Sequence, residues 1–251
     1  MKILSWDVGI YNLSYCILEK NEETKEIKII DWDIVNLVDN EEMKKNTTLI
    51  FENIPRKLHE KSQLLDVDIV VIENQPSLKN PKMKSIQMIL YSYFLILGKV
   101  IGNGDKSGGY IQSIDFCSAS NKLKVYDGPE IILQEKPKRV PKPKLKKDSP
   151  QINIIVNEEN IGEGKIEEGK IEQIKVEEIK MEDGNKDKEE KKKKGSSVKY
   201  ADKKRLAIEH SKYYLKENPE FIDFFNEHKK KDDLADSFLQ GLYYIKKNLK
   251  S

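Results

Sequence analysis

The sequence predicts one α/β domain, a mixed five-stranded sheet flanked by helices, interrupted by a long disordered charged insertion. Three short apolar segments joined by hairpin-like turns open the chain, and two more apolar segments then alternate with helical patterns. Charge is distributed unevenly, and this predicts the insertion. We expect 1–128 and 197–251 to form the domain and 129–196 to form the insertion.

Three strands and a helix are expected in the first 62 residues. The turns contain Gly9, Asn12 and an Asn-Glu-Glu-Thr loop, all typical of hairpins. The helix is predicted because Met43, Leu49 and Ile54 belong to an apolar series with a period near 3.6. The expected strands are 2–8, 11–19 and 26–34, and the expected helix is 41–62.

A buried strand and a long helix follow. Residues 68–73 (DIVVIE) are almost wholly apolar, as in strands covered on both faces. Asn80 and Pro81 provide an N-cap and a proline at the first helical position. This helix is expected to end near Lys99. A fifth strand at 109–117 and two helices, at 200–217 and 231–249, complete the predicted fold.

The net charge of +2 does not show how unevenly the charged residues are distributed along the chain. Between Gln134 and Lys194, 32 of 61 positions are charged and none of the 20 aromatic residues occurs. Such a segment cannot bury enough apolar surface to offset its ordering entropy, so it is predicted to be disordered. It is either a solvated low-complexity expansion or a basic tether for nucleic acid.

Several classes of protein and site are excluded by the composition. Two cysteines rule out a disulfide framework and a four-cysteine zinc site, and the three histidines are scattered. The sequence has no run of about 18 apolar residues, so a membrane-spanning helix is not expected. The first residues enter a strand pattern at once, which leaves no room for a presequence. A cytoplasmic protein is expected.

Carboxylates follow two of the predicted strands. Asp7 ends the first strand and Glu73 ends the buried strand, where α/β sheets place their ligands. Gly9 has no side chain, so a ligand or nucleic-acid backbone could approach there. Each acid taken alone is equally consistent with an ordinary solvated strand end.

A third group of acids opens the last predicted helix. Asp233 and Asp236 are three residues apart and project from one side, with Asp232 as a competitor for the same role. Acids in a first helical turn are also ordinary partners of the helix dipole. Together with Asp7 and Glu73, however, they form an oxygen-rich set suited to Mg²⁺. Two such ions about 3.5–4 Å apart can hydrolyse a phosphodiester.

Four segments in this order resemble the poxvirus-type Holliday junction resolvases, a RuvC-like branch of the ribonuclease H fold found in large DNA viruses. They are DVGIYNLSYCI, VVIENQPSLKNPKMKSIQMILYSYF, SASNKLKVY and KKDDLADSFLQ. The glutamate strand and the DDLADS helix are the specific parts. The resemblance covers about 1–128 and 197–245, and the long insertion departs from the family pattern.

The resemblance implies a ribonuclease H-like sheet and a site of four acids, Asp7, Glu73, Asp233 and Asp236, that binds two Mg²⁺ ions, with Mn²⁺ as a substitute. It also implies a lysine beside the substrate phosphate, for which Lys122 is the first choice and Lys124 the second. The implied activity is resolution of four-way DNA junctions in recombination, repair and replication. The implied assembly is a homodimer, with 85–97 as the candidate interface.

Basic residues fit a DNA substrate. Lys79, Lys82 and Lys84 surround the start of the helix after Glu73, where free N–H groups also favour phosphate. Branched DNA is thus the expected partner, with no membrane and no small-molecule substrate. Two alternatives are a non-catalytic protein that binds branched DNA and an ATPase of the actin-like superfamily. The second would need a glycine-rich phosphate turn and a two-lobed chain, and neither is seen.

Overall fold

The structure, a computed structural model, describes residues 1–78, 80–101, 111–133 and 200–248. All of these residues belong to one compact unit that is built from both ends of the chain. The predicted insertion lies almost wholly outside the described residues.

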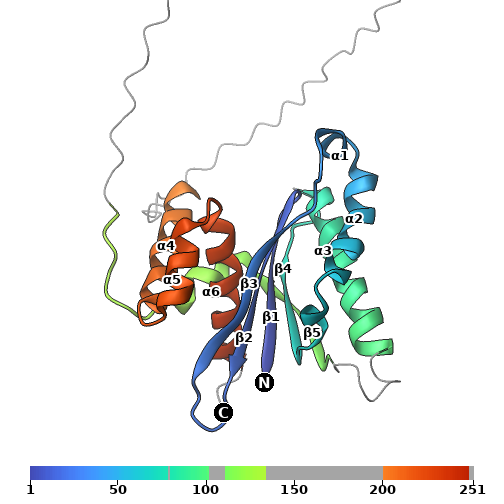
Figure 1. Ribbon diagram of the computed structural model, residues 1–251. Helices are drawn as coiled ribbons and strands as arrows, with labels where there is room; N and C mark the ends of the chain where they lie inside the picture. Colours follow the sequence, from blue (N-terminus) through green and yellow to red (C-terminus); the bar gives the residue numbers. More distant parts are fainter. Residues whose placement is uncertain (79, 102–110, 134–199, 249–251) are drawn as a thin grey trace, which may run out of the picture. The chain divides into compact units, whose positions relative to one another are not determined.

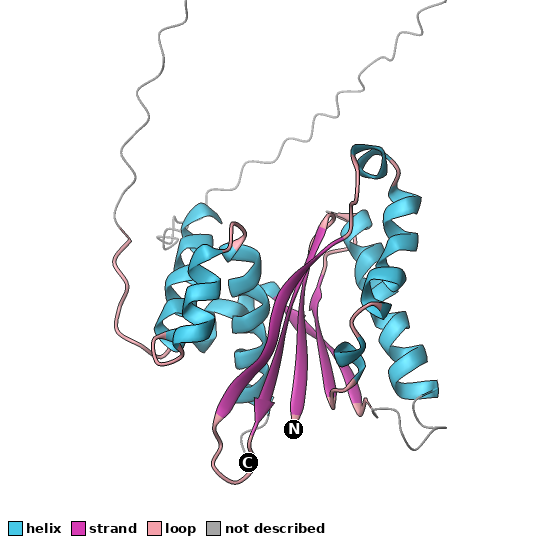
Figure 2. Cartoon of the chain, viewed as in Figure 1, coloured by secondary structure: helices cyan, strands magenta, loops and turns pink. Residues whose placement is uncertain are grey.

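A five-stranded mixed sheet forms the centre of this unit (Figures 1 and 2). Its spatial order is β3-β2-β1-β4-β5, with β1–β2–β3 as an antiparallel meander and β1–β4–β5 parallel. The parallel pairing directs the carboxyl ends of β1, β4 and β5 to one edge. The strands are β1 (Lys2–Val8), β2 (Asn12–Lys20), β3 (Ile27–Asn36), β4 (Ile69–Asn74) and β5 (Ser113–Ser118).

The sheet is covered by helices on both faces, and each face has its own core. Leu4, Trp6 and Val8 of β1 belong to one core, whereas Ile3 belongs to the other. In β4, Val70 and Ile72 face the first core, and Ile69 and Val71 face the second. This alternation follows from the two-residue period of a strand, and it decides which strand residues can meet which helices.

The first face carries α2 and α3. Asn46 begins α2 by accepting from the N–H groups of Thr48 and Leu49, and Asn80 begins α3 by accepting from that of Met83. The predicted N-cap at Asn80 is therefore confirmed. The elements here are α1 (Glu41–Lys45), α2 (Thr47–His59), η1 (Ser62–Leu65), α3 (Pro81–Phe94) and η2 (Leu95–Ile101).

By length and composition, Pro81–Ile101 could cross a membrane, although no such segment was expected from the sequence. Length and composition alone are weak grounds for a membrane span. A third of the most apolar 18-residue window of this segment is buried, and Ile86, Leu90 and Phe94 pack completely into the core against the sheet. One face of this helix is therefore buried in the core of the domain.

The second face carries the elements that follow β5 and the insertion. α6 lies directly on β1 and β2, and it also contacts η3 and α4. The elements are η3 (Ala119–Val125), α4 (Tyr200–Leu215), α5 (Pro219–Glu227) and α6 (Lys231–Asn248). In Figure 2, helices α4–α6 stand on one side of the sheet and α1–α3 on the other.

The predicted fold class and all five strands are confirmed, with shifts at most of the ends. The single helix expected over 41–62 is two helices, because Asn46 caps the second one after the short first one. Helix α5 was not expected, although Pro219 stands at its first position. The strand expected over 109–117 begins at Ser113 within the described residues.

Candidate active site

Asp7 and Glu73 lie side by side on the face of the sheet that α6 covers. β1 and β4 are paired up to Trp6 and Ile72, and the next residue on each strand is one of the two acids. Because Trp6 and Ile72 face the first core, the residues that follow them face the second. Two adjacent parallel strands therefore present one carboxylate each toward the same helix.

The first two turns of α6 bring Asp233 and Asp236 to this place. The helix is fixed by Gln240, whose Nε2 donates to the carbonyl oxygen of Trp6 at 3.0 Å and to Oγ of Ser5 at 3.1 Å. One turn earlier, the hydroxyls of Ser237 and Ser14 lie 2.8 Å apart. These buried contacts set the position of α6 along the strands, and so they set the position of its acids.

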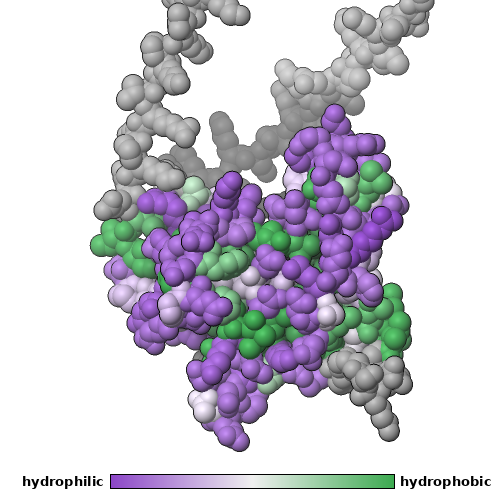
Figure 3. Space-filling view, in the orientation of Figure 1, coloured by the Kyte–Doolittle hydropathy of each residue, from purple (hydrophilic) through white to green (hydrophobic). Residues whose placement is uncertain are grey.

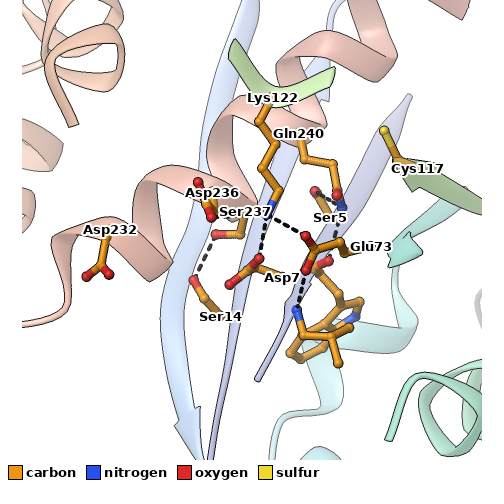
Figure 4. Close-up of polar contacts among 12 residues, drawn as sticks. Ser5, Asp7, Ser14, Glu73, Cys117, Lys122, Asp232, Asp236, Ser237 and Gln240 are labelled. Carbon is orange, nitrogen blue, oxygen red and sulfur yellow. Dashed lines mark hydrogen bonds and ion pairs between the residues drawn. The ribbon is translucent and has the colours of Figure 1, made fainter. Parts of the chain in front are cut away.

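Lys122 lies at the centre of the acids (Figure 4). Its ammonium nitrogen is 2.6 Å from Oδ1 of Asp7 and 3.1 Å from both Oε1 of Glu73 and Oδ2 of Asp236. The lysine side chain is only 5% exposed and comes from η3, the short turn that follows β5. Three of the four predicted acids and the first-choice lysine thus meet at one point.

The charges of this cluster are unbalanced. Burial raises the pKa of Glu73 to about 7, and the nearby Asp7 adds to this effect against the opposing ammonium of Lys122. Burial likewise raises the pKa of Asp236 to about 6. Burial lowers the pKa of Lys122, but the carboxylates of Asp7, Asp236 and Glu73 outweigh it and hold the lysine charged. The cluster has room for more positive charge than one lysine supplies.

Asp232 and Asp233 have different surroundings. Asp232 accepts a hydrogen bond from Nζ of Lys204 on α4, whose charge holds the aspartate pKa below its usual range despite burial. Asp233 lines the same cleft as Asp7 and Asp236, and burial raises its pKa. The geometry therefore favours Asp233 over Asp232 as the fourth acid.

A chain of amide groups supports Glu73 from the other side. Gln75 donates from Nε2 to Oε2 of Glu73 at 2.6 Å, and its own backbone N–H donates to Oε1 of Gln87 at 2.8 Å. The backbone N–H of Val8 donates to the same glutamate oxygen at 3.4 Å. These contacts fix the carboxylate, and none of them was predicted from the sequence.

The other predicted basic residues are not among the acids. Lys84 bonds to Oε1 of Gln87 at 3.1 Å and to Oδ1 of Asn74 at 3.3 Å, and Lys82 is exposed. Lys124 is exposed and bonds to Oδ1 of Asn121 at 2.9 Å, so Lys122 rather than Lys124 meets the carboxylates. Lys79 lies outside the described residues.

A cleft of about 370 Å³ opens over the acids. Its walls include Asp7, Glu73, Asp233 and Asp236, and also three residues that the sequence analysis did not select as site residues: Tyr11, Tyr200 and Lys204. Tyr11 lies in the turn after β1, and the other two lie near the start of α4. Nothing in the sequence distinguished Tyr11 within its motif, and only the fold shows that Tyr200 and Lys204, which follow the insertion, lie beside the acids.

The donor set suits a hard divalent cation, since it consists of carboxylate oxygens that already converge on a cation, the Lys122 ammonium. Among the described residues, however, no group of three or more acids, histidines or cysteines has the spacing to hold a metal ion. The ammonium sets the present spacing of the acids. The chemistry of the site therefore suits a metal that would be held by Asp7, Glu73, Asp233 and Asp236. The ammonium of Lys122 lies in the space between these carboxylates.

Comparison with known proteins supports the fold. No family model matches the chain. An uncharacterized protein of Acanthamoeba polyphaga mimivirus is 25% identical over 98% of this chain and 74% of its own length. The fowlpox virus resolvase, solved with a Holliday junction DNA substrate, matches over 100% of both chains with a TM-score of 0.51 and 16% identity. The yeast mitochondrial Holliday junction resolvase matches with a TM-score of 0.48 and 16% identity, over 97% of this chain and 78% of its own.

The chain thus has the ribonuclease H-like fold of the fowlpox virus resolvase, as the sequence motifs indicated.

Proposed function

We propose that this protein is a metal-dependent endonuclease that resolves four-way DNA junctions by paired, symmetric nicks. One observation carries the proposal: carboxylates from β1, β4 and α6 converge on a single cation at the carboxyl edge of a ribonuclease H-like sheet. Buried like charges are costly to assemble, and a structural role for Lys122 alone would not need three of them. The fowlpox virus resolvase, which has the same fold, was solved with junction DNA.

The acids and Lys122 have separate roles in the proposed reaction. Asp7, Glu73, Asp233 and Asp236 would hold two Mg²⁺ ions, which when bound supply an activated water and stabilise the leaving oxygen. Lys122 would carry its ammonium to the phosphate and stabilise the charge that develops there. Gln75 and Gln240 keep Glu73 and α6 in place, so that the carboxylates need no rearrangement of the backbone.

The proposed enzyme is a homodimer, because two symmetric nicks need two sites. An apolar groove of about 940 Å³ lies between α2 and the α3–η2 segment, on the face of the domain away from α6. Met88 and Ile96 line it with 41% and 50% of their surfaces exposed. Figure 3 shows apolar side chains gathered at the lower right, over the end of this segment. This groove overlaps the interface expected at 85–97.

A non-catalytic protein that binds branched DNA is the alternative. It is favoured by the buried position of Lys122, whose ammonium fills the centre of the acid cluster. An actin-like ATPase is less well supported, because the described residues form one compact unit rather than two lobes.

A cleavage assay separates these functions. Labelled four-way junction and linear duplex of the same sequence are incubated with the protein in Mg²⁺, in Mn²⁺ and in EDTA. Symmetric nicks that require metal and the junction support the proposal. The Asp7→Asn protein is expected to bind the junction and leave it uncut. Saturable binding without nicks in either metal would establish the non-catalytic alternative, and full activity of Asp7→Asn would remove the proposed mechanism.

A further inference from the structure

Two exposed tyrosines stand on the rim of the carboxylate cleft. Tyr200, the first residue of α4, is 75% exposed, and Tyr11, in the turn between β1 and β2, is 43% exposed. Both line the same cleft as the four acids. Large rings of this kind usually bury most of their surface, so two exposed rings beside one polar cleft indicate a surface prepared for a ligand.

Both rings are attached to backbone that is held in place. The carbonyl oxygen of Tyr11 accepts from the N–H of Leu37, the residue after β3, at 2.7 Å. Tyr200 belongs to α4, which packs along α6, and Nζ of Lys204 lies 5.4 Å from the centre of its ring. Because the backbone under each ring is already ordered, stacking of a flat ligand has to order only the side chain.

Lys204 supplies a positive charge at the same rim. Its side chain is 38% exposed and already lies against Asp232, so it is a charged donor next to the cleft rather than inside the acid cluster. Aromatic rings that alternate with basic groups are the usual surface for single-stranded nucleic acid. A base can stack on the ring while the lysine contacts the adjoining phosphate.

We propose that Tyr11 and Tyr200 are stacking platforms for bases next to the cleaved phosphate, and that Lys204 binds the neighbouring phosphate. This inference rests on the proposed nuclease function and adds to it a source of selectivity. In linear duplex, neighbouring base pairs cover the faces of each base, whereas in a four-way junction whose arms are not stacked on one another the base pairs at the branch point expose one face for stacking. The tyrosines therefore favour branched DNA over duplex.

The inference is tested by binding to fluorescently labelled four-way junction and linear duplex, measured by anisotropy with Ca²⁺ in place of Mg²⁺. Tyr11→Ala and Tyr200→Ala are each expected to weaken junction binding by about tenfold, and to leave duplex binding within about twofold. Tyr11→Phe and Tyr200→Phe keep the ring and should bind as the unaltered protein does. The exposure of both rings means that the melting temperature should change little, and this is measured alongside.

Lys204 is tested by the salt dependence of binding. Lys204→Met should lower the slope of log K against log salt concentration by about 0.9, because one phosphate contact is lost. Lys203→Met is the matched control, since Lys203 is exposed on the same turn of α4 and does not line the cleft. It should leave the slope unchanged.

Each other result counts against the inference. Alanine variants that bind the junction normally would overturn it, and so would variants that lose junction and duplex binding equally or are not rescued by phenylalanine. An equal effect of Lys203→Met and Lys204→Met would show a diffuse charge effect. If the unaltered protein binds junction and duplex equally well, the proposed function is contradicted. If the unaltered protein prefers the junction and the tyrosine variants keep that preference, only the inference about the tyrosines is contradicted.

Discussion

Lys122 and Asp7 are 115 positions apart in the chain, yet the lysine Nζ lies 2.6 Å from the aspartate Oδ1. The same nitrogen contacts Glu73 and Asp236, so one ammonium holds acids from two strands and a helix together. Lys122 therefore has a structural role in addition to the one proposed for it in cleavage. In the absence of metal, its ammonium offsets part of the negative charge of the cluster.

Replacing Lys122 tests that role. Lys122→Met keeps the length of the side chain but removes the charge, and we expect it to destabilise the metal-free protein by roughly 2 kcal/mol. The loss is smaller than for a fully buried pair, because Asp236 is 30% exposed and Glu73 can take up a proton. Thermal unfolding in EDTA measures it, and added Mg²⁺ should stabilise the variant more than the unaltered protein.

Lys124→Met is the control for this measurement. Lys124 lies on the same η3 turn but is exposed and away from the acids, so its replacement should leave the melting temperature unchanged. Equal melting temperatures of Lys122→Met and the unaltered protein in EDTA would contradict the structural role.

The raised pKa values predict an unusual dependence of stability on pH. Burial raises the pKa of Glu73 from 4.5 to about 7, so between these values the folded protein binds more protons than the unfolded chain. Its contribution to stability is therefore lost as the pH rises through this range. Asp236 acts in the same direction, with a pKa raised from 3.8 to about 6. In EDTA, the melting temperature should fall by several degrees from pH 5 to pH 8.

Glu73→Gln isolates this effect, because the amide does not titrate. Its melting temperature should depend less steeply on pH than that of the unaltered protein over the same range. Parallel curves for the two proteins would show that Glu73 is ionised in the fold at pH 5, contrary to the expected pKa.

Local sequence patterns predicted the strands well, because their apolar runs and turn residues act over a few positions. β1 has the predicted bounds, and Asn80 caps α3 as expected. Helix α5 was missed because its nine residues are few for a periodic pattern. The break of the expected helix at Asn46 was missed because asparagine suits a cap and a helix surface alike.

The site was predicted only in part, because its geometry depends on contacts between elements that are far apart in the chain. Asp7 and Glu73 could be selected because each ends a strand, and strand ends of parallel neighbours meet at one edge. The choice between Asp232 and Asp233 depends on Lys204, which comes from a helix beyond the insertion. The position of Lys122 depends on how η3 packs on α6. Such tertiary contacts leave no signal in a short stretch of sequence.

The different surroundings of Asp232 and Asp233 predict different effects on cleavage. Asp233→Asn removes an acid of the cleft, and it should reduce the rate by more than the roughly 10- to 100-fold that loss of a supporting group costs. Asp232→Asn breaks only the contact to Lys204, so its rate should stay within about tenfold. The two isosteric variants control for each other in a single-turnover assay on a four-way junction. The reverse order of rates would assign the fourth acid to Asp232.

Gly9 is required by the turn rather than by a ligand. A Cβ at this position would lie 2.4 Å from the backbone carbonyl oxygen of Asn12, a distance that no side-chain movement can relieve. Gly9→Ala should therefore shift the turn and destabilise the protein by about 1–3 kcal/mol. Because the turn follows Asp7 directly and Val8 donates to Glu73, cleavage measured well below the melting temperature should fall as well. A melting temperature within about one degree of that of the unaltered protein would show that the turn accommodates the methyl group. The glycine would then be better explained by close approach of DNA at this position.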